Sequence, residues 1–135
     1  MTKILYVEDD MSSQRLVQRI LMAEGFDVVI ADNGISALEA GRREKPDLIL
    51  MDINISGLDG YEVTTRLRTI EGLENVPIVA VTAATLRGDR ERALVAGCNG
   101  YIPKPIDVDQ FPDQVRAYLV GMEDNVGSAE EKAEY

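Results

Sequence analysis

The chain of 135 residues is long enough for one compact domain and too short for two. It carries 24 acidic residues against 14 basic ones, and this charge of −10 repels phosphate backbones and anionic lipid headgroups, so we expect no binding to nucleic acid or membranes. The absence of histidine excludes a phosphohistidine carrier, a catalytic triad and a His-ligated metal site.

Cysteine content and hydropathy bear on where the protein works. The single cysteine, Cys98, cannot form an internal disulfide, which favours a reducing compartment. No apolar run approaches the length of a membrane span, and the apolar segment after Lys3 is too short for a signal peptide. We therefore expect a cytoplasmic protein.

Short apolar runs rich in branched side chains alternate with stretches of helical periodicity. The runs span residues 4–7, 28–31, 48–51 and 78–81, with a weaker fifth at 101–102. Continuous apolar runs are typical of strands that are covered on both faces. Strict alternation of strands and helices predicts an α/β fold in which a five-stranded parallel sheet has helices on both faces.

Capping residues and prolines mark the helix boundaries. Ser12 or Ser13 is predicted to cap the first helix, and Asn33 the second. Pro112 fits the first turn of the last helix if Asp109 is its cap, because an amide at that position would be unpaired anyway.

The composition of the chain changes near its end. Residues 1–120 contain the alternating strands and helices and are predicted to form one domain. Residues 121–135 contain Gly, Ser and Ala with five acids and one lysine, and are expected to form an acidic flexible tail.

Polar residues follow the predicted strands, where open α/β sheets bind their ligands. The first strand is followed by Glu8-Asp9-Asp10, the third by Asp52, the fourth by Thr82 and the fifth by Lys104. Carboxylates that are brought together repel one another unless a cation neutralises them, and an all-oxygen set suits Mg²⁺. With a lysine and a hydroxyl added, the set suggests a phosphoryl-transfer site in which a carboxylate is the nucleophile.

Four segments in order carry a family resemblance. They are ILYVEDD, PDLILMDINISGLDGYE around Asp52, PIVAVTAAT around Thr82 and GCNGYIPKPID around Lys104. Together they resemble the receiver domain of response regulators in two-component signalling, of the single-domain, chemotaxis-regulator type, over about residues 2–120. The resemblance implies a flavodoxin-like, doubly wound (βα)5 fold with strand order 2-1-3-4-5.

The resemblance also implies a metal site beside the phosphoacceptor. Asp52 matches the aspartate that accepts the phosphoryl group. Asp9 matches a direct Mg²⁺ ligand, Glu8 an acid that acts through water, and Asn54 a residue that lends its backbone carbonyl to the metal. The family usually has proline four residues after the acceptor, where this chain has Ser56, so we expect a slightly different loop.

Further roles follow from the same resemblance. Thr82 and Lys104 match the hydroxyl and the ammonium group that contact phosphoryl oxygens, and Tyr101 matches the aromatic switch residue. The Lys104–Pro105 bond matches a cis peptide of the family. Without the resemblance, Tyr101 reads equally well as a half-buried packing residue.

The family resemblance implies that two further positions tune hydrolysis of the phosphorylated form. Asn54, two residues after the acceptor, has an amide that can hold a water molecule. Ala84, two residues after Thr82, is too small to shield a phosphoryl group. We therefore expect comparatively fast self-dephosphorylation.

The leading functional hypothesis is a phosphorylation-dependent switch, not an enzyme beyond Mg²⁺-dependent self-phosphorylation and self-dephosphorylation. Asp52 would receive its phosphoryl group from a sensor histidine kinase or a histidine phosphotransfer protein. Output would pass to a downstream protein through the face formed by helix four, strand five and helix five. The starting methionine and short acidic tail favour a free-standing protein over a receiver from a larger hybrid kinase.

Two other classes share parts of this pattern. An aspartate-nucleophile phosphohydrolase normally needs a substrate-selecting cap insertion, and no connection here is long enough to hold one. A flavodoxin-like cofactor binder needs a phosphate cradle, whereas the first loop of this chain is acidic.

Overall fold

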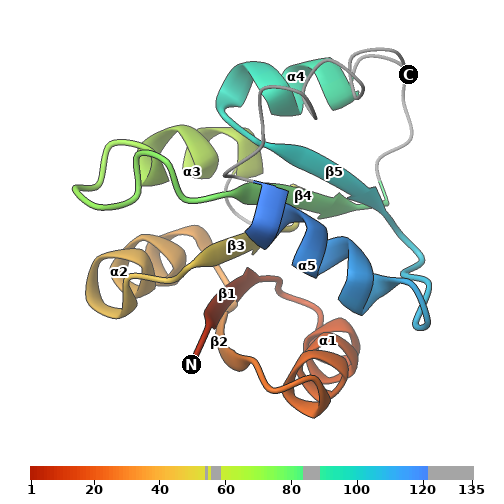
Figure 1. Ribbon diagram of the computed structural model, residues 1–135. Helices are drawn as coiled ribbons and strands as arrows, with labels where there is room; N and C mark the ends of the chain where they lie inside the picture. Colours follow the sequence, from red (N-terminus) through yellow and green to blue (C-terminus); the bar gives the residue numbers. More distant parts are fainter. Residues whose placement is uncertain (54, 56–58, 84–88, 122–135) are drawn as a thin grey trace.

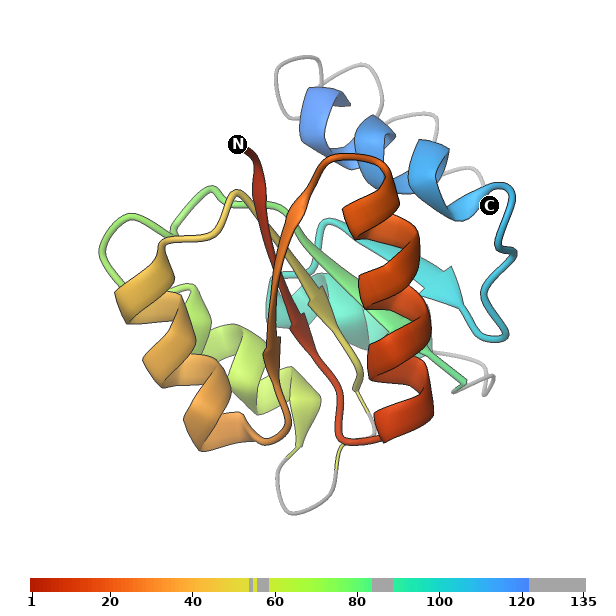
Figure 2. The ribbon, with the colours of Figure 1, turned by 90° about the horizontal axis from the view of Figure 1, so that it is seen from below.

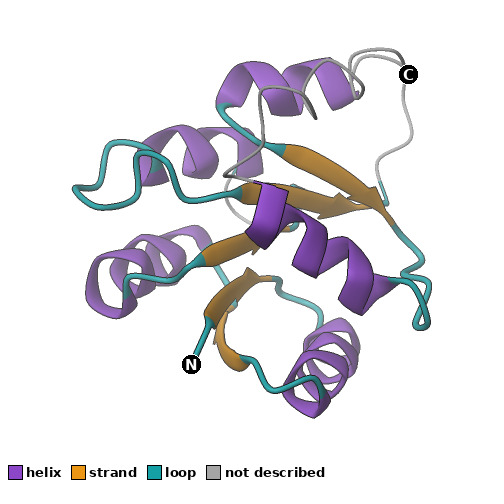
Figure 3. Cartoon of the chain, in the orientation of Figure 1, coloured by secondary structure: helices purple, strands orange, loops and turns teal. Residues whose placement is uncertain are grey.

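The computed structural model describes residues 1–53, 55, 59–83 and 89–121. Its elements alternate between strand and helix along the chain (Figures 1 and 3). In chain order they are β1 (Lys3–Val7), α1 (Met11–Ala23), β2 (Asp27–Ala31), α2 (Gly34–Glu44), β3 (Leu48–Met51), α3 (Gly60–Leu67), β4 (Ile78–Thr82), α4 (Asp89–Ala96), β5 (Gly100–Pro103) and α5 (Phe111–Gly121).

The five strands form one parallel sheet in the order β2-β1-β3-β4-β5. The alternation predicts the parallel sheet, and the family resemblance implies the strand order; both are confirmed. Because all strands run the same way, their carboxyl ends meet at one edge of the sheet. The residues after β1, β3, β4 and β5 therefore lie along a common rim.

Helices cover both faces of the sheet (Figure 2). Side chains alternate along each strand, so Leu5 and Val7 pack in the core beneath α2, α3 and α4. Ile4 and Tyr6 point the other way, toward α1 and α5. Both sets are fully buried, which explains why the strands read as continuous apolar runs.

The helix caps correct one prediction and confirm another. Asp10, not Ser12 or Ser13, caps α1, and its carboxylate accepts the Ser13 amide proton at 2.8 Å. Asp10 is the last extended residue, whereas the two serines already lie inside the helix. Asn33 caps α2 as predicted and accepts the amide proton of Ser36.

The start of α5 agrees only in part with the prediction. Pro112 lies in its first turn, as expected. However, Asp107 rather than Asp109 supplies the side-chain acceptor, and it takes the amide protons of Asp109 and Gln110 at 3.0 and 3.2 Å. The chain turns before the helix begins, so the capping carboxylate stands two residues earlier than predicted.

Within the parts of the chain that the structure describes, no helix is both long and apolar enough to cross a membrane.

Candidate functional site

The rim is held in place by strand pairing that continues beyond the strands themselves. The amide of Glu8, which follows β1, donates to the carbonyl of Ala31 at 2.9 Å. The amide of Asp52, which follows β3, donates to the carbonyl of Val7 at the same distance. These bonds fix the backbone of both acidic residues against the edge of the sheet.

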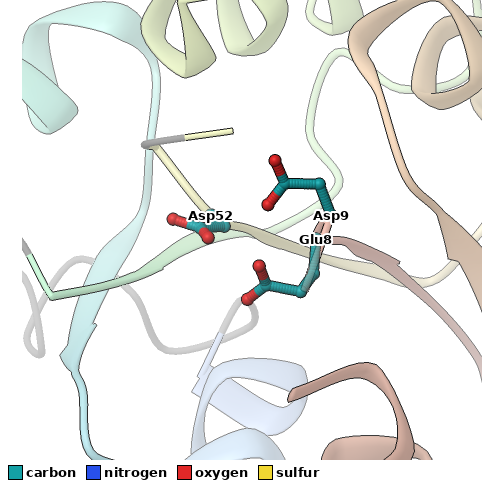
Figure 4. A group of neighbouring side chains, drawn as sticks. All are labelled: Glu8, Asp9 and Asp52. Atoms are coloured by element: carbon teal, nitrogen blue, oxygen red, sulfur yellow. The ribbon is translucent and has the colours of Figure 1, made fainter. Parts of the chain in front are cut away.

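Three carboxylates gather at this edge (Figure 4). Glu8, Asp9 and Asp52 each offer one oxygen, and these oxygens lie within 4.8 Å of one another. Glu8 and Asp52 are only 1% and 6% exposed, whereas Asp9 is exposed. The structure thus brings together the three acids that the sequence singled out.

Lys104 reaches the same cluster from the end of β5. Its Nζ lies 2.5 Å from Oε1 of Glu8 and 3.3 Å from Oδ2 of Asp52. Burial lowers the pKa of Lys104, but the hydrogen bond to Glu8 and the charge of Asp52 outweigh it, so the pKa is raised. Lys104 is therefore a fixed cation at neutral pH.

Hydrogen bonds orient the Glu8 side chain. The hydroxyl of Tyr6 donates to Oε1 at 2.9 Å, and the amide of Asp10 donates to Oε2 at 3.1 Å. Burial and the Glu8 carboxylate raise the pKa of Tyr6, which keeps its hydroxyl a proton donor. Gln14 adds a bond to the Glu8 carbonyl at 2.6 Å.

Sequence reasoning missed the positioning roles of Tyr6 and Gln14. A signal for Tyr6 was present, because residues two apart on a strand share a face, which places Tyr6 beside Glu8. Gln14 lies one turn into α1, and its sequence context gives no comparable signal.

The other predicted site residues lie on β4 or β5, directly after β5, or outside the described part of the chain. Thr82 ends β4, is fully buried, and its carbonyl accepts the Lys104 amide proton at 2.9 Å. Tyr101, on β5, is half-buried against the core beneath α2, α3 and α4. The Lys104–Pro105 peptide bond is cis. Asn54, Ser56 and Ala84 fall outside the described residues.

The donor chemistry of the cluster fits a hard divalent cation. Carboxylate oxygens are the ligands that Mg²⁺ prefers, and three of them stand within reach of one point. Among the described residues, one ammonium group contacts this cluster of three carboxyl groups, which leaves negative charge for such an ion to balance.

Residues 4–116 match the response regulator receiver domain family. The chain belongs to this family. It is a receiver domain of two-component signalling, a phosphorylation-dependent switch. The family resemblance read from the four sequence segments is thereby confirmed.

Curated relatives and solved structures agree with this assignment. The chain is 39% identical to the polar-differentiation response regulator DivK of Brucella anthropi, over 86% of this chain and 94% of the relative. It is 40% identical to the DivK of Brucella ovis, over 88% and 98%.

Among solved structures, the receiver domain of a sensor histidine kinase from Pseudomonas aeruginosa is 36% identical, with a TM-score of 0.80. The match covers 87% of this chain and 97% of that one, and that structure has a magnesium ion coordinated in its active site cleft. A CheY-like receiver from Methanospirillum hungatei is 25% identical, with a TM-score of 0.85 over 93% and 98% of the two chains.

Proposed function

We propose that Asp52 is the phosphoacceptor and that it receives its phosphoryl group from a sensor histidine kinase or a histidine phosphotransfer protein. The observation that carries this proposal is the contact of one ammonium group, Lys104, with both Asp52 and Glu8. An Asp52 oxygen attacks phosphorus as the bond to the donor breaks on the opposite side, and an acyl phosphate results.

Lys104 and Thr82 are proposed to hold the transferred group. The Lys104 ammonium is 3.3 Å from Asp52, close enough to meet an oxygen of a phosphoryl group attached there. Glu8 and Tyr6 keep the ammonium in position. Thr82 offers its hydroxyl from the neighbouring strand end, at the same edge of the sheet.

We propose that Mg²⁺ binds at the acidic cluster, with Asp9 and Asp52 as direct ligands and Glu8 acting through water. The bonds of Glu8 to Lys104 and Tyr6 support its less direct role. The carbonyl of Asn54 is proposed as a further ligand. When bound, the ion neutralises negative charge on the phosphoryl oxygens.

Output is proposed to pass through the face formed by α4, β5 and α5, in a unit comprising residues 1–120 followed by the tail 121–135. We propose that Tyr101 turns inward when Thr82 moves toward a phosphoryl oxygen, and the position of Tyr101 on β5, next to the strand that ends in Thr82, supports this. Asn54 and Ala84 are proposed to control water access and to favour a short-lived phosphorylated state.

Intact-mass measurement after incubation with acetyl phosphate and Mg²⁺ tests the acceptor. The wild-type chain and Asp27→Asn, an exposed aspartate at the opposite end of β2, should each gain one phosphoryl group. Asp52→Asn should gain none. A phosphoryl group on Asp52→Asn, or labelling that persists without Mg²⁺, would show that the acceptor or the metal requirement is misassigned.

A further inference from the structure

A groove runs between α3 and α4, away from the carboxylate cluster. Its volume is about 580 Å³. Asp59, the cap residue before α3, and Tyr61 and Glu62 on α3 line one wall, while Glu91, Arg92 and Val95 on α4 line the other. The two helices lie on the same side of the sheet (Figure 1). The groove belongs to the flank of α4 that faces α3, so it is distinct from the face formed by α4, β5 and α5.

Apolar surface stands open in this groove. Val95 is 89% exposed, whereas Ala93 on the same helix is buried in the core. Tyr61 is half-buried on the opposite wall, and the guanidinium of Arg92 lies over its ring at 4.4 Å. An aliphatic and an aromatic side chain thus face the space between the two helices.

The edges of the groove carry negative charge. Asp59, Glu62 and Glu91 are all exposed, and against these three carboxylates stands Arg92, which is stacked on Tyr61. Arg66 pairs with Glu62 at 3.2 Å, but both side chains are exposed, so water screens this pair and weakens it. The groove therefore combines an apolar interior with an acidic edge.

The far end of the groove is held rigidly. Arg68, at the end of α3, donates to the carbonyl of Gly97, which follows α4, at 2.8 Å from Nη2 and 3.1 Å from Nε. Other donors of the same guanidinium bind the carbonyl of Leu73 and the side chain of Asn99. A groove whose walls are tied together in this way is preformed, which lowers the entropy lost on binding.

We propose that the groove between α3 and α4 docks a basic amphipathic helix of a partner protein. An apolar side chain of that helix would contact Val95 and Tyr61, and its lysines or arginines would face Glu62 and Glu91. Each wall is a helix of eight residues, about 12 Å long, so two to three turns of the partner would fill it.

Charge decides between this occupant and the two that the chain itself could supply. A second copy carries the same net charge of −10. Residues 122–135 contain five acids and one lysine, so that segment would meet the acidic edge with like charge. Only a partner of opposite charge gains from both the edge and the interior of the groove.

Titration of the isotope-labelled full-length chain with a synthetic peptide tests the proposal by NMR. The peptide is a helix of about 14 residues with leucines on one face and lysines on the other, and its counterpart carries glutamates in place of the lysines. We expect the lysine peptide to shift amide signals of residues 61–65 and 91–96, and the glutamate peptide to bind at least about tenfold more weakly. Equal binding of both peptides, or shifts centred on another surface, would overturn the proposal.

Matched variants separate docking from general attraction to an acidic protein. Val95→Asp should weaken peptide binding at least about tenfold, whereas Val120→Asp, at a 63% exposed site on α5, should change it less than about twofold. Glu91→Lys should weaken binding about fivefold, whereas Glu39→Lys, on the exposed side of α2, makes the same charge change with little effect. Equal losses in the control variants would show nonspecific binding and would contradict the proposal.

Labelling with acetyl phosphate on the same variants keeps this test independent of the proposed acceptor chemistry. All four variants leave Asp52, Lys104 and the acidic cluster unchanged, so each should still gain one phosphoryl group. A variant that loses peptide binding but keeps its labelling and its thermal unfolding curve has lost docking and not the fold.

Discussion

The two ends of the parallel strands differ in the groups that surround their charged side chains. At the carboxyl end, Glu8, Asp9 and Asp52 lie close together, and the ammonium group of Lys104 contacts Glu8 and Asp52. At the amino end, the guanidinium of Arg68 is surrounded by neutral oxygens that need its protons. The carboxylates of the first arrangement leave negative charge that a cation could balance, whereas the guanidinium of the second already donates hydrogen bonds to acceptors of the protein.

The amino end gains order from this arrangement. Arg68 donates to the carbonyls of Leu73 and Val76, in the connection that leads to β4. Asn99, which also binds Arg68, accepts the amide proton of Ile78 at 2.8 Å and so fixes the start of β4. The contacts of Arg68 thus order the amino end of β4, while the ligand site that we propose lies at the carboxyl end of the same sheet.

Removing Arg68 should have the largest effect on stability. Arg68→Ala leaves several half-buried oxygens without a donor, and we expect the free energy of unfolding to fall by about 3 kcal/mol. Urea unfolding measures this loss. Arg66→Ala, two residues earlier on α3, removes an exposed ion pair with Glu62 and should change it by less than about 0.5 kcal/mol. Equal losses in both variants would show that the neutral oxygens do not depend on Arg68.

Magnesium should stabilise the carboxyl end and leave the amino end unaffected. At a free concentration 100 times its Kd, Mg²⁺ should raise the free energy of unfolding by about 2.7 kcal/mol. Asp9→Asn should abolish most of this gain, because it removes a proposed direct ligand. Asp27→Asn, at the amino end of β2, should retain it. Thermal unfolding with and without Mg²⁺ makes the comparison. An unchanged melting temperature of the wild-type chain on addition of Mg²⁺ would refute the metal site.

The buried Tyr6 hydroxyl should add a smaller contribution that depends on pH. Burial and the Glu8 carboxylate raise the pKa of Tyr6 in the folded chain above its ordinary value of 10.0. Its contribution is therefore complete below pH 10 and is lost as the pH rises above that value, where the unfolded chain releases the proton first.

Tyr6→Phe tests this contribution. We expect the variant to lose about 2 kcal/mol at pH 8, because Glu8 loses a buried donor, and to show a weaker fall in stability above pH 10 than the wild type. Burial also raises the pKa of Cys98, to about 11, so the stabilising contribution of its protonated thiol is lost in the same pH range. Both the wild type and Tyr6→Phe are therefore compared in a Cys98→Ala background. If the free energy of unfolding of Tyr6→Phe falls with pH above 10 as steeply as that of the wild type, Tyr6 does not cause the pH dependence.

The smallest effect concerns the cap of α1 at the edge of the site. Asp10→Ala should lower the free energy of unfolding by about 1 kcal/mol, because the Ser13 amide loses its acceptor. Ser12→Ala should leave stability nearly unchanged, since Ser12 is exposed and lies inside the helix. A larger loss of stability in Ser12→Ala than in Asp10→Ala, measured by urea unfolding, would show that the serine is the cap.

The carboxyl end could be predicted from the sequence because its residues stand next to the strands that position them. Glu8 and Asp52 directly follow apolar runs that are buried on both faces, so predicting the strands also placed the acids. The sequence marks Tyr6 only as part of an apolar strand, because the residue types do not show which acceptor its hydroxyl reaches. The sequence did not single out Asp10 as the cap of α1, because the two serines that follow it have about the same capping propensity.

The amino end could not be predicted in the same way. Arg68 binds oxygens of Leu73, Gly97 and Asn99, which lie up to 31 residues away in sequence. Most of these acceptors are backbone carbonyls, which every residue has, so no side-chain pattern marks them. An arginine with this role looks like any other polar residue at the end of an amphipathic helix.

The contact between Lys104 and Glu8 joins residues 96 positions apart, and Lys104 follows the last strand of the sheet. A growing chain on the ribosome therefore holds Glu8 and Asp52 long before the lysine that lies between them has been synthesised. The same holds for a chain whose β5 has detached from β4. The set of residues that we propose to bind the phosphoryl group is therefore complete only in a fully synthesised and folded molecule, and we expect incomplete chains to be phosphorylated poorly. If Lys104 has its proposed role, the span of this one ion pair would limit signalling to complete, folded molecules.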